Sequence, residues 1–511
     1  MVNANESQDR RIARWLGVAL FCLYMLSAPM REPYGDEYHY LSIARNLLTT
    51  GRPVSASLSY APDGSAVVTP QYTHYAIGQS LVALPFVALA SLWEWMAPAS
   101  ASPFLGRMTL YLLPALQCAA MAALVYLLAR LSGRAAPSLS VSRGTAIAMA
   151  LCAGAGTQLW PSAATFFADT SAACFMTAAV YCLFRMRAAR GGRGCLVAAA
   201  WAMALAALCK GPFLLACPAL ALYGFWQARS PQVGFPRAAG FWTGVYCLAP
   251  FVLAAGLVAW YNHARFGSVW QTGYHAGGAG NLFGFSTPLY VGLYGIFLSA
   301  GRSVFLYSPL CLLAFGGARR FARALRPEAM MLAGACAPII ALYAKWWAWY
   351  GGWEWGNRFA LFLIPLLMWV SLPAWRWLDR AALPRATRRL RMAGLALLLP
   401  ASLLVQLPGV LIHPAAVWRL MVDEVALFPH PQYQPGVWEL RDDMFVVHYT
   451  PQFSPVAVHA WLVWATLHRG RLTESELAAR APWVSLNPQW RPQQVEPYLG
   501  FTPWVLSLGP P

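Results

Sequence analysis

The sequence predicts an all-α polytopic membrane protein with about eleven transmembrane helices, a large first outer loop and a small C-terminal outer region. Hydrophobic residues make up 59% of the 511 residues and charged residues 11%, and the mean hydropathy is +0.47. Apolar runs of about 17–25 residues, the length of a membrane-spanning helix, recur along the chain. The bases behind the net charge of +18 lie in short loops between these runs. This pattern indicates membrane orientation and argues against nucleic-acid binding.

The N-terminal residues 1–13 are polar and basic and are predicted to be cytoplasmic. The run Trp15–Pro29 is predicted to be an uncleaved first span, because no small-residue cleavage site follows it. Basic loops follow alternate spans, and placing them all in the cytoplasm gives a consistent zigzag. The ten further predicted spans lie near residues 104–130, 144–160, 167–184, 195–209, 212–228, 239–260, 288–315, 329–346, 359–375 and 392–411.

A further apolar stretch, residues 73–95, is also long enough to cross the bilayer. If it crossed, every later basic loop would lie outside, which the positive-inside rule disfavours. We therefore predict that residues 74–97 lie along the outer interface or re-enter, with Trp93 and Trp95 at headgroup depth. The predicted units are then a transmembrane domain (residues 14–411), its first outer loop (30–103) and an outer C-terminal region (412–511).

The eleven cysteines are scattered through or beside the apolar runs, with no CxxC pair and no Cys/His metal spacing. They are interpreted as small buried hydrophobic residues and not as a disulfide framework.

Two adjacent acids, Asp36 and Glu37, open an amphipathic helix in the first outer loop. Leu41, Ala44 and Leu48 share its apolar stripe. One interpretation is a helix cap, since free N–H groups and the helix dipole favour acids in the first turn. The other is a general base with a supporting acid at the membrane surface. This stretch alone leaves both interpretations open.

Other ionisable residues fall at the predicted outer ends of spans. Asp169 begins an apolar span, where it either caps a helix or serves a functional site. Lys210 interrupts an apolar stretch before Gly-Pro, either as a snorkelling interfacial lysine or as a phosphate ligand. Arg302 falls inside a predicted span and is expected to face a cavity, an anion or the interface.

The Trp-rich stretch KWWAWYGGWEWGNR, residues 345–358, suits an aromatic belt or a platform on which a sugar stacks. Its Glu354 and Arg358 have the spacing of an i,i+4 salt bridge. Under the predicted topology these residues share the outer side with His74 and with the residues named above. A transporter more often places its ionisable groups near the midplane of the bilayer.

These stretches together resemble the integral-membrane glycosyltransferases of the C-type fold (GT-C) that use polyprenyl-phosphate sugars. Their relatives include protein O-mannosyltransferases and the lipid A aminoarabinose transferases. The resemblance covers roughly residues 14–375 and rests on the order of several motifs. It is carried by GDEYHYLSIARNLL at 35–48, THYAIGQSL at 73–81, SPFLGRMTLYLLPAL at 102–116, ADTS at 168–171, LCKGP at 208–212 and YGGWEWGNRF at 350–359. His74 is followed by Tyr75, where the family pattern often has proline.

The resemblance implies inverting transfer of a sugar from a polyprenyl-phosphate donor to an acceptor hydroxyl, at the periplasmic face of the bacterial inner membrane. Asp36 would be the general base, and Glu37 and Asp169 would orient substrates or, in some relatives, a divalent metal. Lys210 with Arg302 or Arg358 would hold the lipid phosphate. His74 and Arg107 complete the predicted substrate-binding residues. No cofactor and no metal site is predicted, because three acids on two loops are a thin ligand set.

Two other classes of function stay open at the level of sequence. A non-catalytic transporter or flippase for a lipid-linked glycan would share the membrane architecture. A scaffold of the cell envelope would use the acidic pair for helix capping alone. The acceptor, which is a lipid, a polysaccharide or a protein, and the identity of the sugar are not specified by any motif.

Overall fold

The computed structural model describes residues 2–29, 35–60, 66–98, 102–188, 192–229, 237–273, 284–352, 354–379, 385–412, 448–468 and 471–482. These residues are mainly helical. The helices are α1 (Val2–Leu26), α2 (Asp36–Thr50), α3 (Gly78–Met96), α4 (Ser102–Ala135), α5 (Arg143–Ala155), α6 (Leu159–Ser162), α7 (Ala168–Ala188), α8 (Arg193–Cys209), α9 (Cys217–Ala228), α10 (Arg237–Phe266), α11 (Leu289–Leu298), α12 (Val304–Tyr307), α13 (Leu313–Ala324), α14 (Arg326–Lys345), α15 (Leu363–Val370), α16 (Leu372–Trp375), α17 (Arg385–Leu411), α20 (Pro455–His468) and α21 (Glu474–Ala478).

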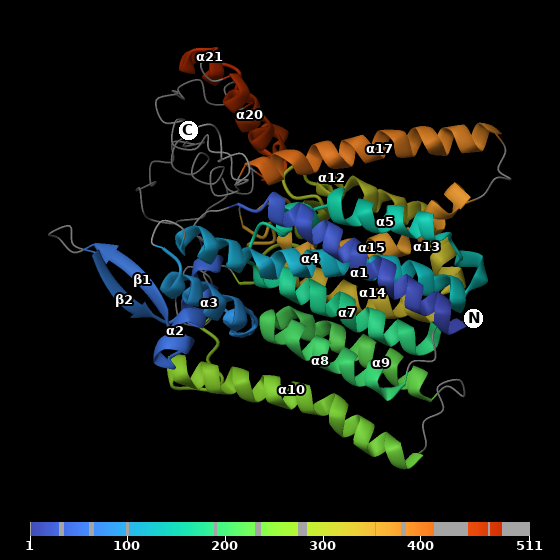
Figure 1. Ribbon diagram of the computed structural model, residues 1–511, viewed down its shortest axis with the longest axis horizontal. Coiled ribbons are helices and arrows are strands. Elements are labelled where there is room, and N and C mark those ends of the chain that lie inside the picture. The colour runs from blue at the N-terminus through green and yellow to red at the C-terminus, as the bar shows by residue number, and fades with distance from the viewer. Residues whose placement is uncertain are drawn as a thin grey trace.

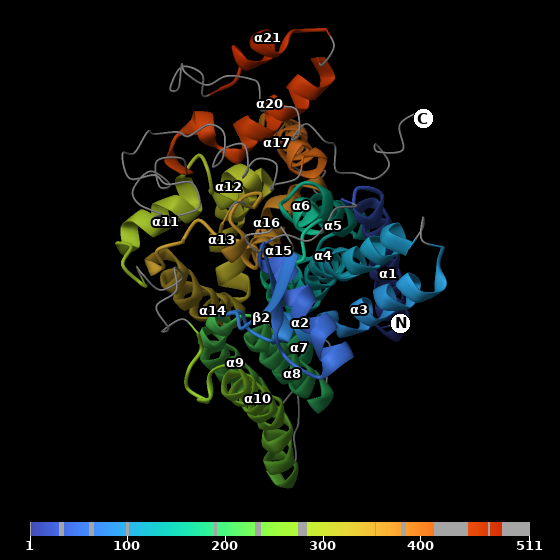
Figure 2. The same cartoon turned by 90° about the vertical axis from the view of Figure 1, so that its left-hand side faces the viewer.

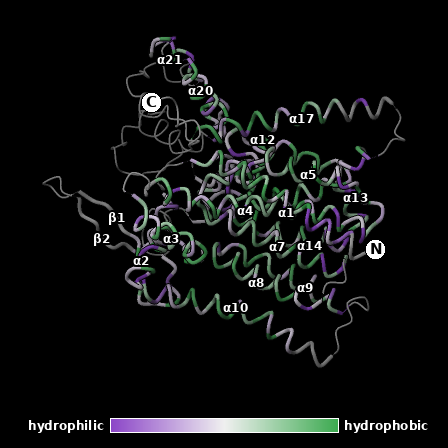
Figure 3. Tube along the Cα trace, viewed as in Figure 1, coloured by the Kyte–Doolittle hydropathy of each residue, from purple (hydrophilic) through white to green (hydrophobic). Residues whose placement is uncertain are grey.

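The long helices lie side by side in a bundle, with α10 along one edge and α17 along the opposite edge in both views (Figures 1 and 2). The tube is mostly hydrophobic along the middle of the bundle, and hydrophilic residues gather toward its two ends (Figure 3). The buried core is built mainly from α1, α4, α5, α7, α14 and α15. This arrangement is that of a multi-pass membrane protein.

Five helices among the described residues are long and apolar enough to cross a membrane. Four of them match predicted spans: Phe104–Ala135, Trp242–Phe266, Arg326–Lys345 and Ala393–Leu411. The fifth, Gly78–Met96, is the stretch predicted to lie at the interface. In Figure 1 this helix, α3, lies at one end of the bundle beside α2, and its contacts are mainly with α2 and α4. The eleven-span count and the interfacial placement of α3 therefore stay predictions.

Four predicted spans are not single helices. Residues 144–160 are divided between α5 and α6, and residues 212–228 begin in the 3₁₀ turn Gly211–Ala216 before α9. Residues 288–315 form α11, α12 and the 3₁₀ turn Pro309–Leu312 in place of one helix. The break after Leu298 coincides with Gly301 and Arg302, and a proline follows at the next turn. Residues 359–375 are likewise divided, into the end of the 3₁₀ turn η4 (Arg358–Ala360) and the helices α15 and α16.

The first loop also holds a feature that the all-α prediction did not include. Strands β1 (Ser55–Tyr60) and β2 (Ala66–Gln71) form an antiparallel pair, with Ser55 opposite Gln71 and Tyr60 opposite Ala66. The hairpin projects from the same end of the bundle as α2 and α3 (Figure 1). The prediction of an all-helical chain was therefore wrong for this loop, because the interval between α2 and α3 was assigned no structure of its own.

The opposite end of the bundle holds the N-terminus and an ionic cluster. Asp9, which is 3% exposed, accepts from the side chains of Arg130 at 3.3 Å, Arg134 at 3.3 Å and Arg143 at 3.1 Å. The N-terminal helix therefore lies with the loops predicted to share its side of the membrane. The paired charges also offset the cost of burying Asp9.

The described part of the C-terminal region packs on the bundle. Helix α20 contacts α17, and the Nδ1 atom of His459 lies 3.1 Å from the carbonyl oxygen of Pro408. Most of the predicted outer region, including residues 413–447 and 483–511, lies outside the described residues.

Candidate active site

Four charged side chains from distant parts of the chain meet at the end of the bundle that carries α2. Asp36 is in the first turn of α2 and Asp169 in the first turn of α7. Lys210 directly follows the last residue of α8, and Arg358 begins the turn η4. We call Asp36, Asp169, Lys210 and Arg358 the charged cluster. All four are residues that the sequence analysis selected.

Arg358 connects the two carboxylates of the charged cluster. Its Nη1 atom lies 2.9 Å from Oδ2 of Asp36, and its Nε atom lies 3.8 Å from Oδ2 of Asp169. The Nζ atom of Lys210 lies 3.1 Å from the same Asp169 oxygen. Two cations and two anions therefore balance in a site whose side chains are at most 18% exposed.

Asp36 is held on both of its carboxylate oxygens. The hydroxyl of Tyr75 donates to Oδ1 at 2.7 Å, while Arg358 occupies Oδ2. Burial of Asp36 opposes its ionisation. The charges of Arg358 and Lys210, with the Tyr75 hydrogen bond, outweigh that effect and lower the pKa of Asp36 below its ordinary value. Asp36 is therefore an anion at neutral pH.

The neighbouring acid, Glu37, bonds to the backbone of the segment before α7. It is 1% exposed, and its Oε1 atom accepts from the backbone N–H of Phe166 at 2.7 Å. Phe166 lies in the segment that leads into α7, so this bond fixes the approach to Asp169. Gly35 precedes the pair with φ 54°, a conformation that glycine adopts at little cost. The two adjacent acids thus have different tasks, because successive helical side chains face different directions.

Aromatic rings cover the cations of the charged cluster. The guanidinium carbon of Arg358 lies 4.4 Å from the ring centroid of Phe167, and the Lys210 Nζ atom lies 5.0 Å from that of Phe359. Lys210 has extended backbone (φ −147°, ψ 106°) and is followed by Gly-Pro, which opens the next turn. The helix therefore ends at the lysine and leaves its side chain at the end of the bundle.

The segment that carries His74 and Tyr75 is fixed by Arg265 near the end of α10. Arg265 is 7% exposed and donates to the backbone carbonyls of Thr73 and, at 3.4 Å, Tyr75. The ring of His74 lies against that of Tyr75, with 4.3 Å between centroids. Burial lowers the pKa of His74, so its imidazole is neutral at neutral pH.

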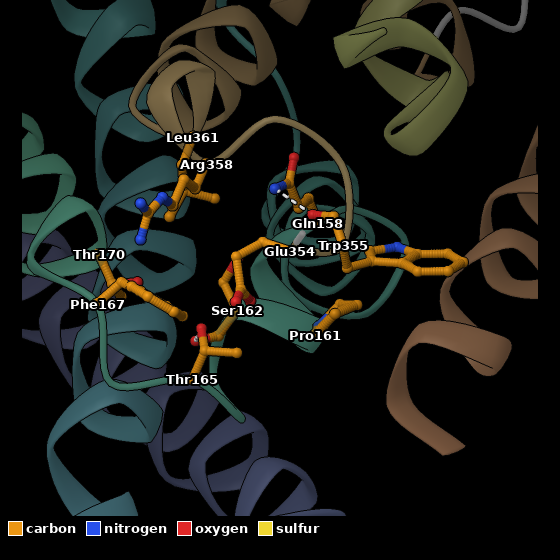
Figure 4. Close-up of a pocket in the computed structure, with 10 residues that line it drawn as sticks. All are labelled: Gln158, Pro161, Ser162, Thr165, Phe167, Thr170, Glu354, Trp355, Arg358 and Leu361. Atoms are coloured by element: carbon orange, nitrogen blue, oxygen red, sulfur yellow. Dashed lines mark hydrogen bonds between the residues drawn. The ribbon is translucent and has the colours of Figure 1, made fainter. Parts of the chain in front are cut away.

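A small cavity opens beside Arg358 (Figure 4). In Figure 4 the guanidinium of Arg358 and the ring of Phe167 lie on one side, Ser162 and Thr165 lie nearer the centre, and Pro161 lies on the other side. The cavity measures about 10 Å³, the size of one water molecule. Its lining adds the carboxylate of Glu354 and the amide of Gln158 to the hydroxyls of Ser162 and Thr165. The cavity is lined by Gln158, Pro161, Ser162, Thr165, Phe167, Thr170, Glu354, Trp355, Arg358 and Leu361.

Two predicted substrate-binding residues lie elsewhere. Arg302 is fully buried, and its Nη1 atom donates to the backbone carbonyls of Glu354 and, at 2.8 Å, Gly356. It therefore lies behind the loop that carries Arg358. Arg107 is half-buried near the start of α4, and the contacts described above do not involve it.

Sequence reasoning missed Tyr75, Arg265 and Phe167. Tyr75 stood out only as a departure from a proline pattern. No motif in the sequence singles out Arg265 or Phe167. Within the described ranges, no group of three or more His, Cys, Asp or Glu side chains is arranged to hold a metal ion.

No protein-family model and no curated protein matches the chain. Among solved structures, it is similar to ArnT from Cupriavidus metallidurans in the apo state. The identity is 17% and the TM-score 0.45, over 92% of this chain and 73% of that one. It is also similar to ArnT from Cupriavidus metallidurans bound to undecaprenyl phosphate, with 16% identity and a TM-score of 0.44, over 92% and 74% of the two chains. ArnT is thus a structural neighbour of this chain, at a similarity too low to transfer residue roles.

Proposed function

We propose that this protein is a membrane glycosyltransferase that moves a sugar from a polyprenyl-phosphate donor to an acceptor hydroxyl, with inversion, at the periplasmic face of the bacterial inner membrane. One observation carries the proposal. Two carboxylates and two cations, Asp36, Asp169, Lys210 and Arg358, converge beside a cavity at one end of an apolar bundle. Acid–base chemistry and anion binding are the two requirements of this reaction.

The lipid phosphate is the leaving group, and Arg358 and Lys210 suit it. A guanidinium can bind a phosphate through two parallel N–H donors, and an ammonium binds it as a point charge. Both cations are now neutralised by carboxylates, so the site is electrostatically balanced without substrate. A phosphate that enters competes with those carboxylates for the cations.

Asp36 is the proposed general base. When Arg358 turns toward the phosphate, it releases the Oδ2 atom of Asp36, and the loss of the adjacent positive charge raises the pKa of Asp36. The freed carboxylate then accepts the proton of the acceptor hydroxyl. The acceptor oxygen bonds to the anomeric carbon as the bond from that carbon to the phosphate oxygen breaks. A single displacement of this kind inverts the anomeric configuration.

The sugar would lie between the charged cluster and the cavity. The Oδ1 atom of Asp169 is buried and has no hydrogen-bond partner among the described residues. A sugar hydroxyl would satisfy it, since a buried carboxylate oxygen without a donor is costly. Glu37 supports this arrangement through the Phe166 backbone, and His74 and Arg107 remain predicted substrate contacts.

Mass spectrometry of envelope lipids and glycans tests the proposal. The samples are the wild type, a deletion strain, and deletion strains complemented by the Asp36→Asn or Glu94→Gln variant. Glu94 is an exposed acid of α3 that pairs with Arg45 and serves as the matched control. We expect one sugar mass to vanish on deletion, to return with Glu94→Gln and to stay absent with Asp36→Asn.

The same experiment separates the alternatives. If Asp36→Asn restores every product at a normal protein level, then Asp36 is not the base, and transport of a lipid-linked glycan becomes the better interpretation. If deletion changes no sugar at all, the enzyme proposal itself is refuted. A product that returns with both variants would leave Asp36 only a structural role, through its contacts with Arg358 and Tyr75.

A further inference from the structure

The loop that presents Arg358 to Asp36 has an irregular backbone. Gly351, Gly352 and Gly356 have φ values of 77°, 83° and 68°, the left-handed region that favours glycine. One internal bond spans the loop, from the Asn357 side-chain amide to the carbonyl of Trp349 at 2.9 Å. Arg358 begins the short 3₁₀ turn η4 directly after this irregular stretch, so contacts from outside the loop help to set its direction.

Side chains from two other segments bind the carbonyls of this loop. Arg302 donates to the carbonyls of Glu354 and Gly356, and Gln158 donates to the carbonyl between them, that of Trp355, at 2.6 Å. Three successive carbonyls are thus held just before Arg358. The bonds from Arg302 are charge-assisted and fully buried, which makes them the stronger part of this contact.

Arg302 is in turn held by the C-terminal segment. Its Nε atom donates to the Nδ1 atom of His448 at 3.3 Å, and the backbone N–H of Gly301 donates to the carbonyl of His448 at 2.8 Å. The ring of His448 stacks on that of Tyr350, with 4.3 Å between centroids and 27° between planes. A Cβ atom on Gly301 would lie 2.5 Å from the His448 carbonyl oxygen, so only glycine fits this approach.

We propose that the C-terminal segment at His448 completes the active site, and that Arg302 and His448 are positioning residues for Arg358. The inference rests on the proposed function of Arg358 as a ligand of the lipid phosphate. His448 fixes Arg302, Arg302 fixes the carbonyls of residues 354 and 356, and the loop then aims Arg358 at the charged cluster. The segment at His448 therefore contributes to the position of Arg358 in the membrane domain.

Two substitutions of His448 separate its hydrogen bond from its packing. His448→Phe keeps a ring to stack on Tyr350 but removes the acceptor for Arg302. His448→Asn loses the ring but keeps a side-chain oxygen near the position of Nδ1. We expect His448→Phe to raise both the KM for the lipid donor and the inhibition constant of undecaprenyl phosphate about tenfold, since a bond to a charged group is lost. His448→Asn should restore both constants to within a few-fold of the wild type.

These constants distinguish positioning from general stability. A variant that merely folds less well lowers the amount of active protein and leaves its KM and inhibition constant unchanged. Gly301→Ala is the second test, because its Cβ atom must displace the His448 backbone. Gly316→Ala is the matched control, since no atom lies within 4 Å of that Cβ position. We expect Gly301→Ala to raise both constants and Gly316→Ala to leave them at the wild-type values.

Either of two results overturns the inference. One is wild-type constants in both His448→Phe and Gly301→Ala. The other is a His448→Phe variant with wild-type constants beside an impaired His448→Asn variant, which would assign the role to ring stacking. Asp36→Asn, measured beside them, distinguishes this failure from failure of the proposed function. If Asp36→Asn is inactive while the two variants behave as wild type, the enzyme proposal survives and the positioning role does not.

Discussion

Replacement of Arg358 by glutamine is the most informative single change in the charged cluster. The variant keeps a polar but shorter side chain and removes the positive charge from Oδ2 of Asp36. Lys210 remains as the second cation, and Tyr75 still donates to Asp36. The change thus tests anion binding and base strength together, in a cluster that retains half of its positive charge.

The expected loss follows from what Arg358 contacts. If it binds the leaving phosphate, its removal costs about as much as the loss of one preorganised donor, roughly 10²–10³ in kcat. That factor equals about 2.7–4 kcal/mol of barrier. Breaking the buried pair with Asp36 also destabilises the fold, by about 3 kcal/mol. This lies at the low end for buried pairs, because Asp36 keeps Tyr75 and its side chain is 18% exposed.

The pH profile of kcat/KM supplies a second measurement, and the direction in which it should shift follows from the contacts of Asp36. In the wild type, the charge of Arg358 helps to lower the pKa of Asp36, so this proposed base stays ionised in mildly acidic solution. The stability that this pairing provides is present above the unfolded pKa and is lost as the pH falls through the folded pKa. Without Arg358 the pKa of Asp36 rises. The acid limb of kcat/KM then moves to higher pH.

The assay is sugar transfer by purified enzyme from pH 9 down to about pH 3, because the lowered pKa of Asp36 places the wild-type acid limb below its ordinary range. Arg45→Gln is the control. Arg45 forms an exposed pair with Glu94 in the same loop region, and such pairs contribute little. We expect Arg45→Gln to match the wild type in both rate and pH profile. A loss below about tenfold in Arg358→Gln, or an acid limb that coincides with that of the wild type, would refute the reasoning.

Two further predictions follow from single contacts, and a third follows from the predicted topology. Lys210→Met should raise the inhibition constant of undecaprenyl phosphate about 10²-fold. Lys345→Met, at an exposed site, is the control and should leave this constant unchanged. Equal effects of the two substitutions would contradict phosphate binding by Lys210. Glu37→Ala removes the acceptor of the Phe166 N–H and should lower the free energy of unfolding by about 1–3 kcal/mol. Denaturation of the protein in detergent measures this change. An unchanged denaturation midpoint would contradict a stabilising role of the Glu37 hydrogen bond. Reporters fused before and after residues 73–95 should lie on the same side of the membrane, and opposite sides would contradict the predicted topology.

The charged cluster was predictable because each member interrupts or borders an apolar run. Asp169 and Lys210 stand at the ends of spans in a chain with few acids, and the positions of the basic loops assigned both to one side. That assignment places residues on a surface of the membrane but sets no distance between them. The distances depend on how α2, α7 and α8 pack, which is a tertiary property.

Other parts of the site required the fold itself. The rotation of α2 decides that Asp36 enters the cluster and Glu37 does not, and that rotation is set by packing against α3. The break after Leu298 turns Arg302 toward backbone carbonyls, where one continuous span was expected. Its contact with His448 joins residues 146 positions apart, with no pattern in the sequence to link them.

The two ends of the bundle show why an acid near a span end is weak evidence for function by itself. At the N-terminal end, the buried carboxylate of Asp9 is paired with three arginines. At the other end, Arg358 is shared between Asp36 and Asp169, an oxygen of Asp169 lacks a partner, and a cavity lies alongside. The proposal of an active site at the α2 end therefore rests on the carboxylate oxygen without a partner and on the adjacent cavity, and not on the presence of a buried acid alone.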